Sequence, residues 1–304
     1  MTRCLLVQPI DASGVAVLQA AGIEVLAAPD TGHKVLAPLL ADADVAITRN
    51  WGFPSAALAL APRLKVIGVH GTGMDRVDLA GARARGITVV NTPGANAPDV
   101  AELALGLMLA AARQLVAADA SVRSGDGGWR QRNRGLGLGG RCLGLWGWGH
   151  VSRALVPMAR GLGMRVLVLS AHADPAELAA LGAERAVDAA DLLAQADVLS
   201  LHGVPGPRPV IGAVELAALR PGAILVNTAR GALIDEQALA LALHSGHLGA
   251  AALDVTRDEP LPMDSPLLTC PNLTLAPHVG GNTGRALAVT AQAVARAVLE
   301  ALGR

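Results

Sequence analysis

The sequence predicts an α/β protein with parallel sheets, and three observations support this prediction. Short runs rich in Val, Ile and Leu alternate with helix-like segments along the whole chain, a pattern typical of βαβ units. The stretch from Leu143 to Ser170 has the order strand, glycine turn, helix, strand. The length of 304 residues allows two domains of ordinary size, each with its own core.

In the first 95 residues we expect five strands and four helices. Strands are predicted at Cys4–Val7, Ile23–Leu26, Val45–Ile47, Val66–Val69 and Thr88–Val90, and helices at Gly14–Ala21, Lys34–Leu40, Ala56–Leu60 and Val77–Arg85. Ligands of open α/β sheets bind outside the carboxyl ends of strands. The loops that follow the third and fourth strands are therefore candidate ligand sites, although simple tight turns explain them equally well. Their candidate residues are Arg49, His70, Gly71, Thr72 and Gly73.

The middle of the chain carries a predicted domain crossing and a long helix. Asn91–Gly94 is a turn cluster, and a helix is predicted from Pro98 to about Val122. Its most apolar part, Leu103–Ala112, is too short to span a bilayer. The basic loop Trp129–Arg134 is expected to be solvated surface, or to attract an acidic substrate if it lies over a cleft.

The glycine turn predicts a dinucleotide site. A short apolar strand is followed by Gly147-Trp148-Gly149 and then by the start of a helix at His150 and Val151. Glycines let backbone N–H groups approach a pyrophosphate, and the helix N-terminus favours its negative charge. The third glycine position holds Ser152, so the motif alone is a weak signal.

A second sheet is predicted after this turn. Strands are expected at Val187, Val198–Leu201, Ile224–Val226, Leu248–Leu253 and Leu273–Leu275, and helices at Ala189–Gln195, Gly212–Leu219, Glu236–Ser245 and Gly281–Leu302.

Three residues that follow strands of this half fit one chemistry together. Arg230, Glu259 and His278 each also have an ordinary structural explanation. An arginine binds a carboxylate bidentately, a histidine exchanges protons near neutral pH, and a neighbouring carboxylate fixes the tautomer of that histidine and favours its protonated form. With a nicotinamide as hydride source, this set suits interconversion of a 2-oxo acid and a 2-hydroxy acid.

Composition excludes several other classes. The net charge is zero, which argues against nucleic-acid and membrane-surface binding. The three cysteines are scattered with no C-x-x-C spacing, so neither a metal site nor a disulfide framework is expected. The first ten residues contain no long apolar run, so no signal peptide is expected, and reduced thiols fit a cytoplasmic protein.

The ordered motifs resemble the D-isomer-specific 2-hydroxyacid dehydrogenase family, which includes D-3-phosphoglycerate dehydrogenases and hydroxypyruvate/glyoxylate reductases. The resemblance covers nearly the whole chain and rests on HGTGMDRVDLAGARARGITVVNTPGANA (70–97), VAELALGLMLA (100–110), LGLWGWGHVSRAL (143–155), LRPGAILVNTARGALIDEQAL (219–239), AALDVTRDEPLP (251–262) and PNLTLAPHVGGNT (271–283).

The resemblance implies an architecture. The chain would form two flavodoxin/Rossmann-like domains, in which a cofactor domain at 96–278 is inserted into a substrate-binding domain at 1–95 plus 279–304. It also implies a homodimer formed through the long helix, and we expect no C-terminal regulatory domain of the kind that longer family members carry.

The resemblance also implies roles for single residues. Arg230 would bind the substrate, Glu259 would pair with the acid/base His278, and Asp254 would face the nicotinamide carboxamide. The loop His70–Gly73 would meet the substrate carboxylate. Thr228 and Ala229, beside Arg230, join the turn residues as expected cofactor contacts.

Two departures from the family pattern affect specificity. Where NAD-dependent members carry an aspartate at the end of the second cofactor strand, this chain has Ser170, so the cofactor is NAD or NADP with relaxed or NADP-leaning selectivity. Several basic residues are expected around a substrate phosphate. Arg49 and the loop at Arg130, Arg132 and Arg134 are present, but the arginine expected just before Gly71 is absent, and Val69 and His70 stand there. A small substrate such as hydroxypyruvate or glyoxylate is the first expectation. D-3-phosphoglycerate dehydrogenase activity and a non-enzymatic dinucleotide sensor or corepressor are alternatives.

Overall fold

The computed structural model describes residues 1–304. The chain divides into two compact units, which are described separately. The first comprises Met1–Asn96 and Gly281–Arg304, and the second comprises Ala97–Gly280. The chain thus leaves the first unit, builds the second, and returns to finish the first.

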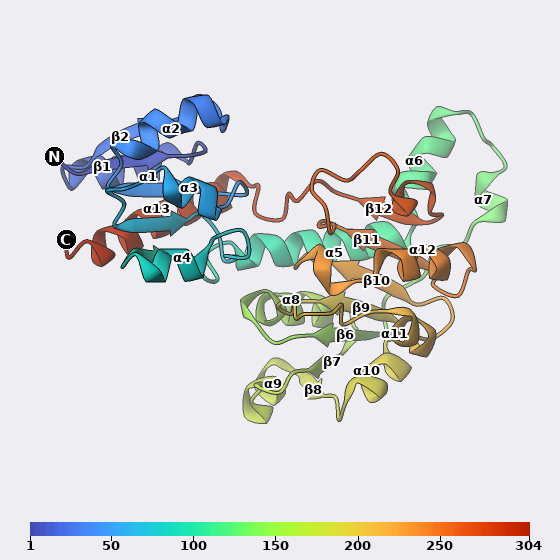
Figure 1. The fold of residues 1–304 in the computed structure, drawn as a ribbon. Helices are drawn as coiled ribbons and strands as arrows, with labels where there is room; N and C mark the ends of the chain where they lie inside the picture. Colours follow the sequence, from blue (N-terminus) through green and yellow to red (C-terminus); the bar gives the residue numbers. More distant parts are fainter. The chain divides into compact units, whose positions relative to one another are not determined.

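The first unit is a five-stranded parallel sheet with helices on both faces (Figure 1). Its strand order, β2-β1-β3-β4-β5, is the flavodoxin-like order. The elements are β1 (Arg3–Leu6), α1 (Ala12–Ala20), β2 (Glu24–Ala27), α2 (His33–Ala41), β3 (Val45–Thr48), α3 (Ser55–Ala59), β4 (Val66–Val69), α4 (Leu79–Ala84), β5 (Thr88–Val90) and α13 (Gly284–Ala301).

Two aliphatic cores cover the two faces of this sheet. Side chains from α1 and α13 pack on one face, and those from α2, α3 and α4 pack on the other. The helices α1 and α13 approach closely because Gly14 has no side chain; a Cβ there would lie 2.5 Å from the carbonyl oxygen of Ala291. The last helix of the chain therefore belongs to the core of the first unit.

The second unit is built on a seven-stranded parallel sheet of order β12-β11-β10-β9-β6-β7-β8. Six of these strands follow the doubly wound order of dinucleotide-binding folds, with the change of direction between β6 and β9. The elements are α5 (Ala97–Ala112), α6 (Leu115–Arg123), α7 (Trp129–Arg132), β6 (Cys142–Trp146), α8 (His150–Gly161), β7 (Arg165–Leu169), α9 (Pro175–Leu181), β8 (Ala183–Arg185), α10 (Ala189–Gln195), β9 (Val198–Leu201), α11 (Ala213–Ala218), β10 (Ile224–Asn227), η1 (Gly231–Leu233), α12 (Glu236–His244), β11 (Ala250–Leu253), η2 (Pro266–Thr269) and β12 (Leu273–Leu275).

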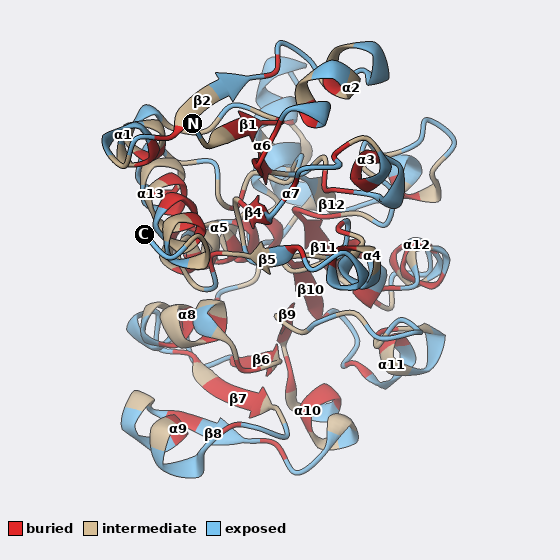
Figure 2. Ribbon diagram, turned by 60° about the vertical axis from the view of Figure 1, so that its left-hand side comes forward, coloured by how far each residue is buried: buried red, intermediate tan, exposed pale blue.

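Helices α5, α8 and α9 cover one face of this sheet, and α10, α11 and α12 cover the other. The central strands are fully buried, which explains why β9, β10 and β11 are mostly apolar on both faces, without alternating apolar and polar residues. Figure 2 shows these strands as buried, whereas the edge strand β8 is largely exposed. The predicted α/β class with two parallel sheets is thus confirmed.

The structure differs from the local predictions in four places. The expected single helix from Pro98 to Val122 is two helices bent by 58°, because Gln114 adopts a left-handed conformation with φ of 50°. The strand expected at Val187 lies earlier, at Ala183–Arg185, and Val187 itself is exposed. The basic loop begins with the short helix α7, and α9 was not expected.

No single helix has the length and apolar character needed to cross a membrane; the bent pair α5 and α6 meets that test only as a pair, by length and composition.

Candidate active site

Three neighbouring strands of the second unit place the candidate catalytic residues at one edge of the sheet. Arg230 follows β10, Glu259 lies in the loop after β11, and His278 follows β12. Strands β10, β11 and β12 are adjacent and parallel, so their carboxyl ends lie side by side. Residues distant in the sequence are therefore collected at the edge where α/β sheets bind ligands.

His278 and Glu259 form a hydrogen-bonded pair. The imidazole Nδ1 lies 3.0 Å from Glu259 Oε2, and both side chains are partly exposed. The backbone of His278 has a φ of 54°, a conformation that costs free energy for a residue other than glycine. Because the carboxylate accepts at Nδ1, a proton on that nitrogen stays there, and Nε2 is left for exchange with a ligand.

Asp254 holds the segment that contains His278. Its carboxylate oxygens accept the backbone N–H groups of Val279 and Gly280 at 2.8 and 2.9 Å, and its carbonyl accepts the N–H of His278 at 2.8 Å. Burial raises the pKa of this carboxyl, while the two N–H donors oppose that shift. Asp254 is buried and thus fixes the course of the chain from β12 through residue 280.

Arg230 is held at the end of β10 by a compact turn. The amide of Asn227 donates to the Arg230 carbonyl at 2.8 Å and accepts the N–H of Ala229 at 3.0 Å. The Arg230 guanidinium donates to the Ala229 carbonyl at 2.7 Å. The next residue, Gly231, leaves no room for a side chain, since a Cβ there would lie 2.0 Å from the carbonyl carbon of Thr256. The β10 and β11 loops therefore pack directly on each other.

The glycine turn has the geometry that a dinucleotide pyrophosphate requires. Gly147 follows β6 with a φ of 109°, and Gly149 precedes the first residue of α8. The N-terminus of α8 thus opens at the switch point between β6 and β9, with His150 and Val151 in its first turn. Backbone N–H groups in such a turn bind phosphate oxygens.

Ser152, at the third glycine position, supports the turn. Its side chain is fully buried, and its hydroxyl donates to the Gly147 carbonyl at 2.8 Å. The small side chain thus still permits close packing of α8 on the sheet, and it adds a hydrogen bond that a glycine could not make.

We expect Gly147→Ala to weaken dinucleotide binding about tenfold to a hundredfold, since an unfavourable backbone conformation costs about 1–3 kcal/mol. A Cβ at Gly147 would also lie 2.6 Å from the His202 carbonyl oxygen. The measurement is a fluorescence titration with the dinucleotide. The control is Gly161→Ala at the end of α8, where a Cβ meets nothing within 4 Å. An unchanged Kd for Gly147→Ala would contradict this account of the turn.

Two further observations fit a dinucleotide at this edge. The Thr228 hydroxyl, just after β10, is buried and has no hydrogen-bond partner in the protein, and such a group is normally satisfied by a ligand or water. Ser170, after β7, accepts the His172 N–H through its hydroxyl at 3.2 Å. No carboxylate stands at position 170 for a ribose hydroxyl, as the sequence indicates.

The remaining candidates belong to the first unit. Arg49 follows β3, and the loop His70–Gly73 follows β4. The Gln8 amide oxygen accepts the N–H groups of Arg49 and Trp51 at 3.1 and 2.8 Å. His70 Nε2 is buried without a partner, and burial, together with nearby Arg49, lowers the pKa of His70. These residues thus share the carboxyl edge of the first sheet.

A side-chain cluster that the sequence did not indicate supports the glycine turn. Trp148 Nε1 donates to Glu177 of α9 at 2.8 Å, Arg153 pairs with the same carboxylate at 2.5 and 3.0 Å, and the guanidinium carbon lies 5.0 Å from the indole ring centroid. The hydrogen bond from Arg153, then that from Trp148, lowers the pKa of Glu177 to about 2. Asp174-Pro175 followed by Glu177 is a helix-start pattern, and it was the available signal for α9.

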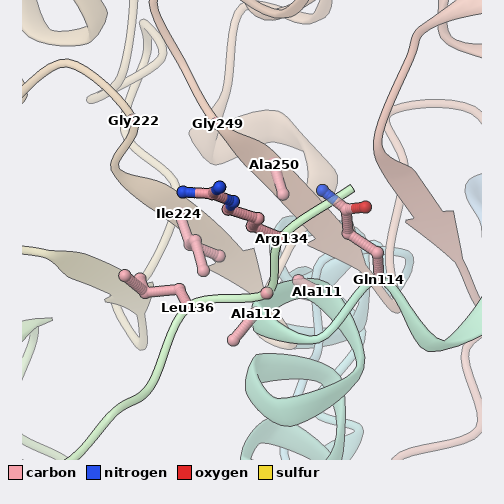
Figure 3. Close-up of a pocket in the computed structure, with 10 residues that line it drawn as sticks. Ala111, Ala112, Gln114, Arg134, Leu136, Gly222, Ile224, Gly249 and Ala250 are labelled. Carbon is pink, nitrogen blue, oxygen red and sulfur yellow. The ribbon is translucent and has the colours of Figure 1, made fainter. Parts of the chain in front are cut away.

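A shallow hollow of about 230 Å³ lies at the opposite edge of the second sheet (Figure 3). Figure 3 shows the end of α5 and the segment around Arg134 beside the start of β10 and β11, where Gly222, Ile224 and Gly249 line it. Since these are the amino ends of the strands, the hollow is separate from the candidate active site.

Comparisons with known proteins agree with this geometry. Residues 105–280 match the model of the NAD binding domain of D-isomer specific 2-hydroxyacid dehydrogenases. A D-3-phosphoglycerate dehydrogenase of Methanocaldococcus jannaschii is 37% identical over 99% of this chain, which spans only 58% of that relative. A glyoxylate reductase of Thermococcus litoralis is 41% identical over 78% of this chain and 73% of its own.

Solved structures show the same likeness. A glyoxylate reductase from Paecilomyes thermophila superposes with a TM-score of 0.88 at 30% identity, covering 100% of this chain and 96% of that one. The family model covers more than half of the chain, and the sequence relatives exceed 30% identity. The chain therefore belongs to the D-isomer-specific 2-hydroxyacid dehydrogenase family.

Proposed function

We propose that this protein is an NAD(P)-dependent oxidoreductase that interconverts a 2-oxo acid and a D-2-hydroxy acid. The observation that carries the proposal is the His278–Glu259 pair at 3.0 Å, on the same sheet edge as Arg230 and the glycine turn. A proton donor, a carboxylate anchor and a dinucleotide turn are the parts that this reaction needs.

Each of the three residues has a distinct role in the proposed reaction. Arg230 binds and orients the substrate carboxylate through its guanidinium. Protonated His278 donates its Nε2 proton to the substrate oxygen as the carbonyl becomes an alcohol, and takes it back in the reverse direction. Glu259 holds the Nδ1 proton and stabilises the positive charge on the ring. When bound, the nicotinamide supplies or accepts the hydride.

The fit to a nicotinamide dinucleotide rests on the chain's own groups. Gly147, Trp148, Gly149, His150 and Val151 would hold the pyrophosphate, because they form the turn and first helical residues at the switch point. Thr228 and Ala229 would contact the nicotinamide half, where the unpartnered Thr228 hydroxyl lies. Asp254 would receive the carboxamide.

For the substrate, hydroxypyruvate or glyoxylate is the first proposal. Arg49 and the backbone of His70–Gly73 would contribute to binding its carboxylate. D-3-phosphoglycerate is the second candidate, since Arg49 and the basic residues around α7 suit an extra anionic group. Within that segment Arg132 already pairs with Asp126 at 2.5 Å, which leaves fewer free charges for a phosphate and favours the smaller substrates.

We propose relaxed or NADP-leaning cofactor selectivity. Ser170 offers a hydroxyl where a carboxylate would bind the 2′-hydroxyl of NAD and repel a 2′-phosphate. We also propose a cytoplasmic homodimer formed through α5 and α6. Leu115, Val116 and Val122 of α6 are exposed, and exposed apolar side chains on one element are typical of an interface.

The test is a panel of 2-oxo acids mixed with NADH or NADPH, read as loss of nicotinamide absorbance. We expect turnover with hydroxypyruvate or glyoxylate. Silence across the panel with both cofactors, while the dinucleotide still binds, would favour a sensor or corepressor on the same fold. The presence together of Arg230, Glu259 and His278, which a pure sensor does not need, favours the enzyme.

A further inference from the structure

We propose that Arg185 of the edge strand β8, together with Ser170 and His172, binds the 2′-phosphate of NADPH. This inference rests on the proposed function, because it names the group that selects the cofactor at that same site. The residue was not a candidate in the sequence, where it lies 15 positions after Ser170. Only the sheet brings the two together.

The register of the sheet places Arg185 near Ser170. Strands β7 and β8 are parallel neighbours, with Val168 opposite Arg185, and the Ala186 N–H donates to the Val168 carbonyl at 2.8 Å. With a strand spacing of about 4.8 Å and a rise of about 3.3 Å per residue, the Cα atoms of Arg185 and Ser170 lie about 8 Å apart. An extended arginine side chain covers that distance.

Arg185 is available, whereas Arg153 on α8 and Arg165 on β7 are engaged. Arg153 pairs with Glu177, and Arg165 binds Glu184 and Gln195. Arg185 is exposed and has no side-chain partner in the protein. An unpaired guanidinium at the carboxyl end of a cofactor-domain strand offers the bidentate geometry that phosphate oxygens accept.

None of the neighbouring carboxylates pairs with Arg185, and each has another hydrogen-bond partner. Glu177 is held by Arg153 and Trp148. Asp174 accepts the N–H of Ala176, Asp188 accepts that of Asp191, and Asp191 accepts that of Val187. Each of these groups is thus engaged in capping a helix or bracing a turn.

The loop after β7 supplies the rest of the subsite. The Ser170 hydroxyl already accepts the His172 N–H at 3.2 Å, and this bond turns residues 170–172 sharply at the end of the strand. The His172 imidazole is exposed and has no partner in the protein. A hydroxyl, an imidazole and a guanidinium, with no carboxylate at position 170, form a set suited to a phosphate dianion.

The experiment compares the Kd values of NADPH and NADH for the wild type and for Arg185→Gln, by nicotinamide fluorescence titration. We expect Arg185→Gln to weaken NADPH binding about tenfold to a hundredfold, as for loss of a hydrogen bond to a charged group, and to leave NADH within about twofold. Arg83→Gln, in the last turn of α4 of the first unit, removes the same charge from another exposed arginine and should change neither value.

A second variant tests the same site by adding a negative charge instead of removing a positive one. Ser170→Asp should weaken NADPH binding and spare NADH, because a carboxylate repels a phosphate. The inference is overturned if Arg185→Gln affects both cofactors equally or neither, or if the wild type binds NADH much more tightly than NADPH. If the wild type prefers NADH in this way but still reduces a 2-oxo acid with it, the proposed function stands and only the phosphate subsite is contradicted.

Discussion

His278→Ala will lower kcat for 2-oxo acid reduction about 10²–10⁴-fold, which is the usual contribution of a positioned general acid. The variant keeps the glycine turn and Thr228, so its Kd for the dinucleotide should stay near the wild-type value. The measurement combines steady-state nicotinamide absorbance with a fluorescence titration of the cofactor. A lower kcat with an unchanged Kd would show that His278 acts in proton transfer and not in cofactor binding.

A matched control for this variant is His244→Ala. His244 ends α12, and its Nδ1 lies 2.8 Å from the Ala240 carbonyl oxygen, so its loss should leave kcat unchanged. Near-normal turnover in His278→Ala would show that another group carries the proton. Loss of cofactor binding in His278→Ala would instead indicate a damaged fold, and a comparison of Tm values detects that case.

Arg230→Gln is expected to lower kcat/KM for the 2-oxo acid about 10²–10³-fold, because removal of one partner of a desolvated charge pair costs about 2–5 kcal/mol. Arg230→Lys should recover only part of this loss, since an ammonium cannot form the bidentate contact. The measurement is kcat/KM with the 2-oxo acid varied at saturating cofactor.

Arg208→Gln serves as the control for Arg230. Arg208 is exposed in the loop after β9, and its replacement should leave kcat/KM within about twofold, as is usual for surface substitutions. An Arg230→Gln enzyme with an unchanged KM and kcat would contradict the assignment of Arg230 as the carboxylate anchor.

The apolar runs were sufficient to predict the sheets. A buried parallel strand is mostly apolar on both faces, so β3, β4, β9 and β10 stand out from the sequence as short, mostly hydrophobic segments. The position of Arg230 after β10 followed from the same pattern, whereas β12, the strand before His278, is a short apolar run that is only partly buried. The sequence alone can therefore predict that residues following parallel strands lie at one edge of the sheet.

The rest depended on tertiary contacts that carry no local signal. The bend between α5 and α6 occurs at Gln114, where neither glycine nor proline marks it. The left-handed conformation of His278 is maintained by Asp254, whose carboxylate accepts two backbone N–H groups that lie 25 and 26 positions further along the chain. Likewise, only the register of β7 and β8 relates Arg185 to Ser170.

The most direct test of the proposed chemistry is to mix the purified protein with NADPH and hydroxypyruvate, follow nicotinamide absorbance, and determine the configuration of the product. The account predicts loss of the reduced cofactor with formation of D-glycerate, and a loss about 10²–10⁴-fold slower in His278→Ala. An unchanged absorbance with hydroxypyruvate, glyoxylate and both cofactors, in a protein that still binds the dinucleotide, would contradict it.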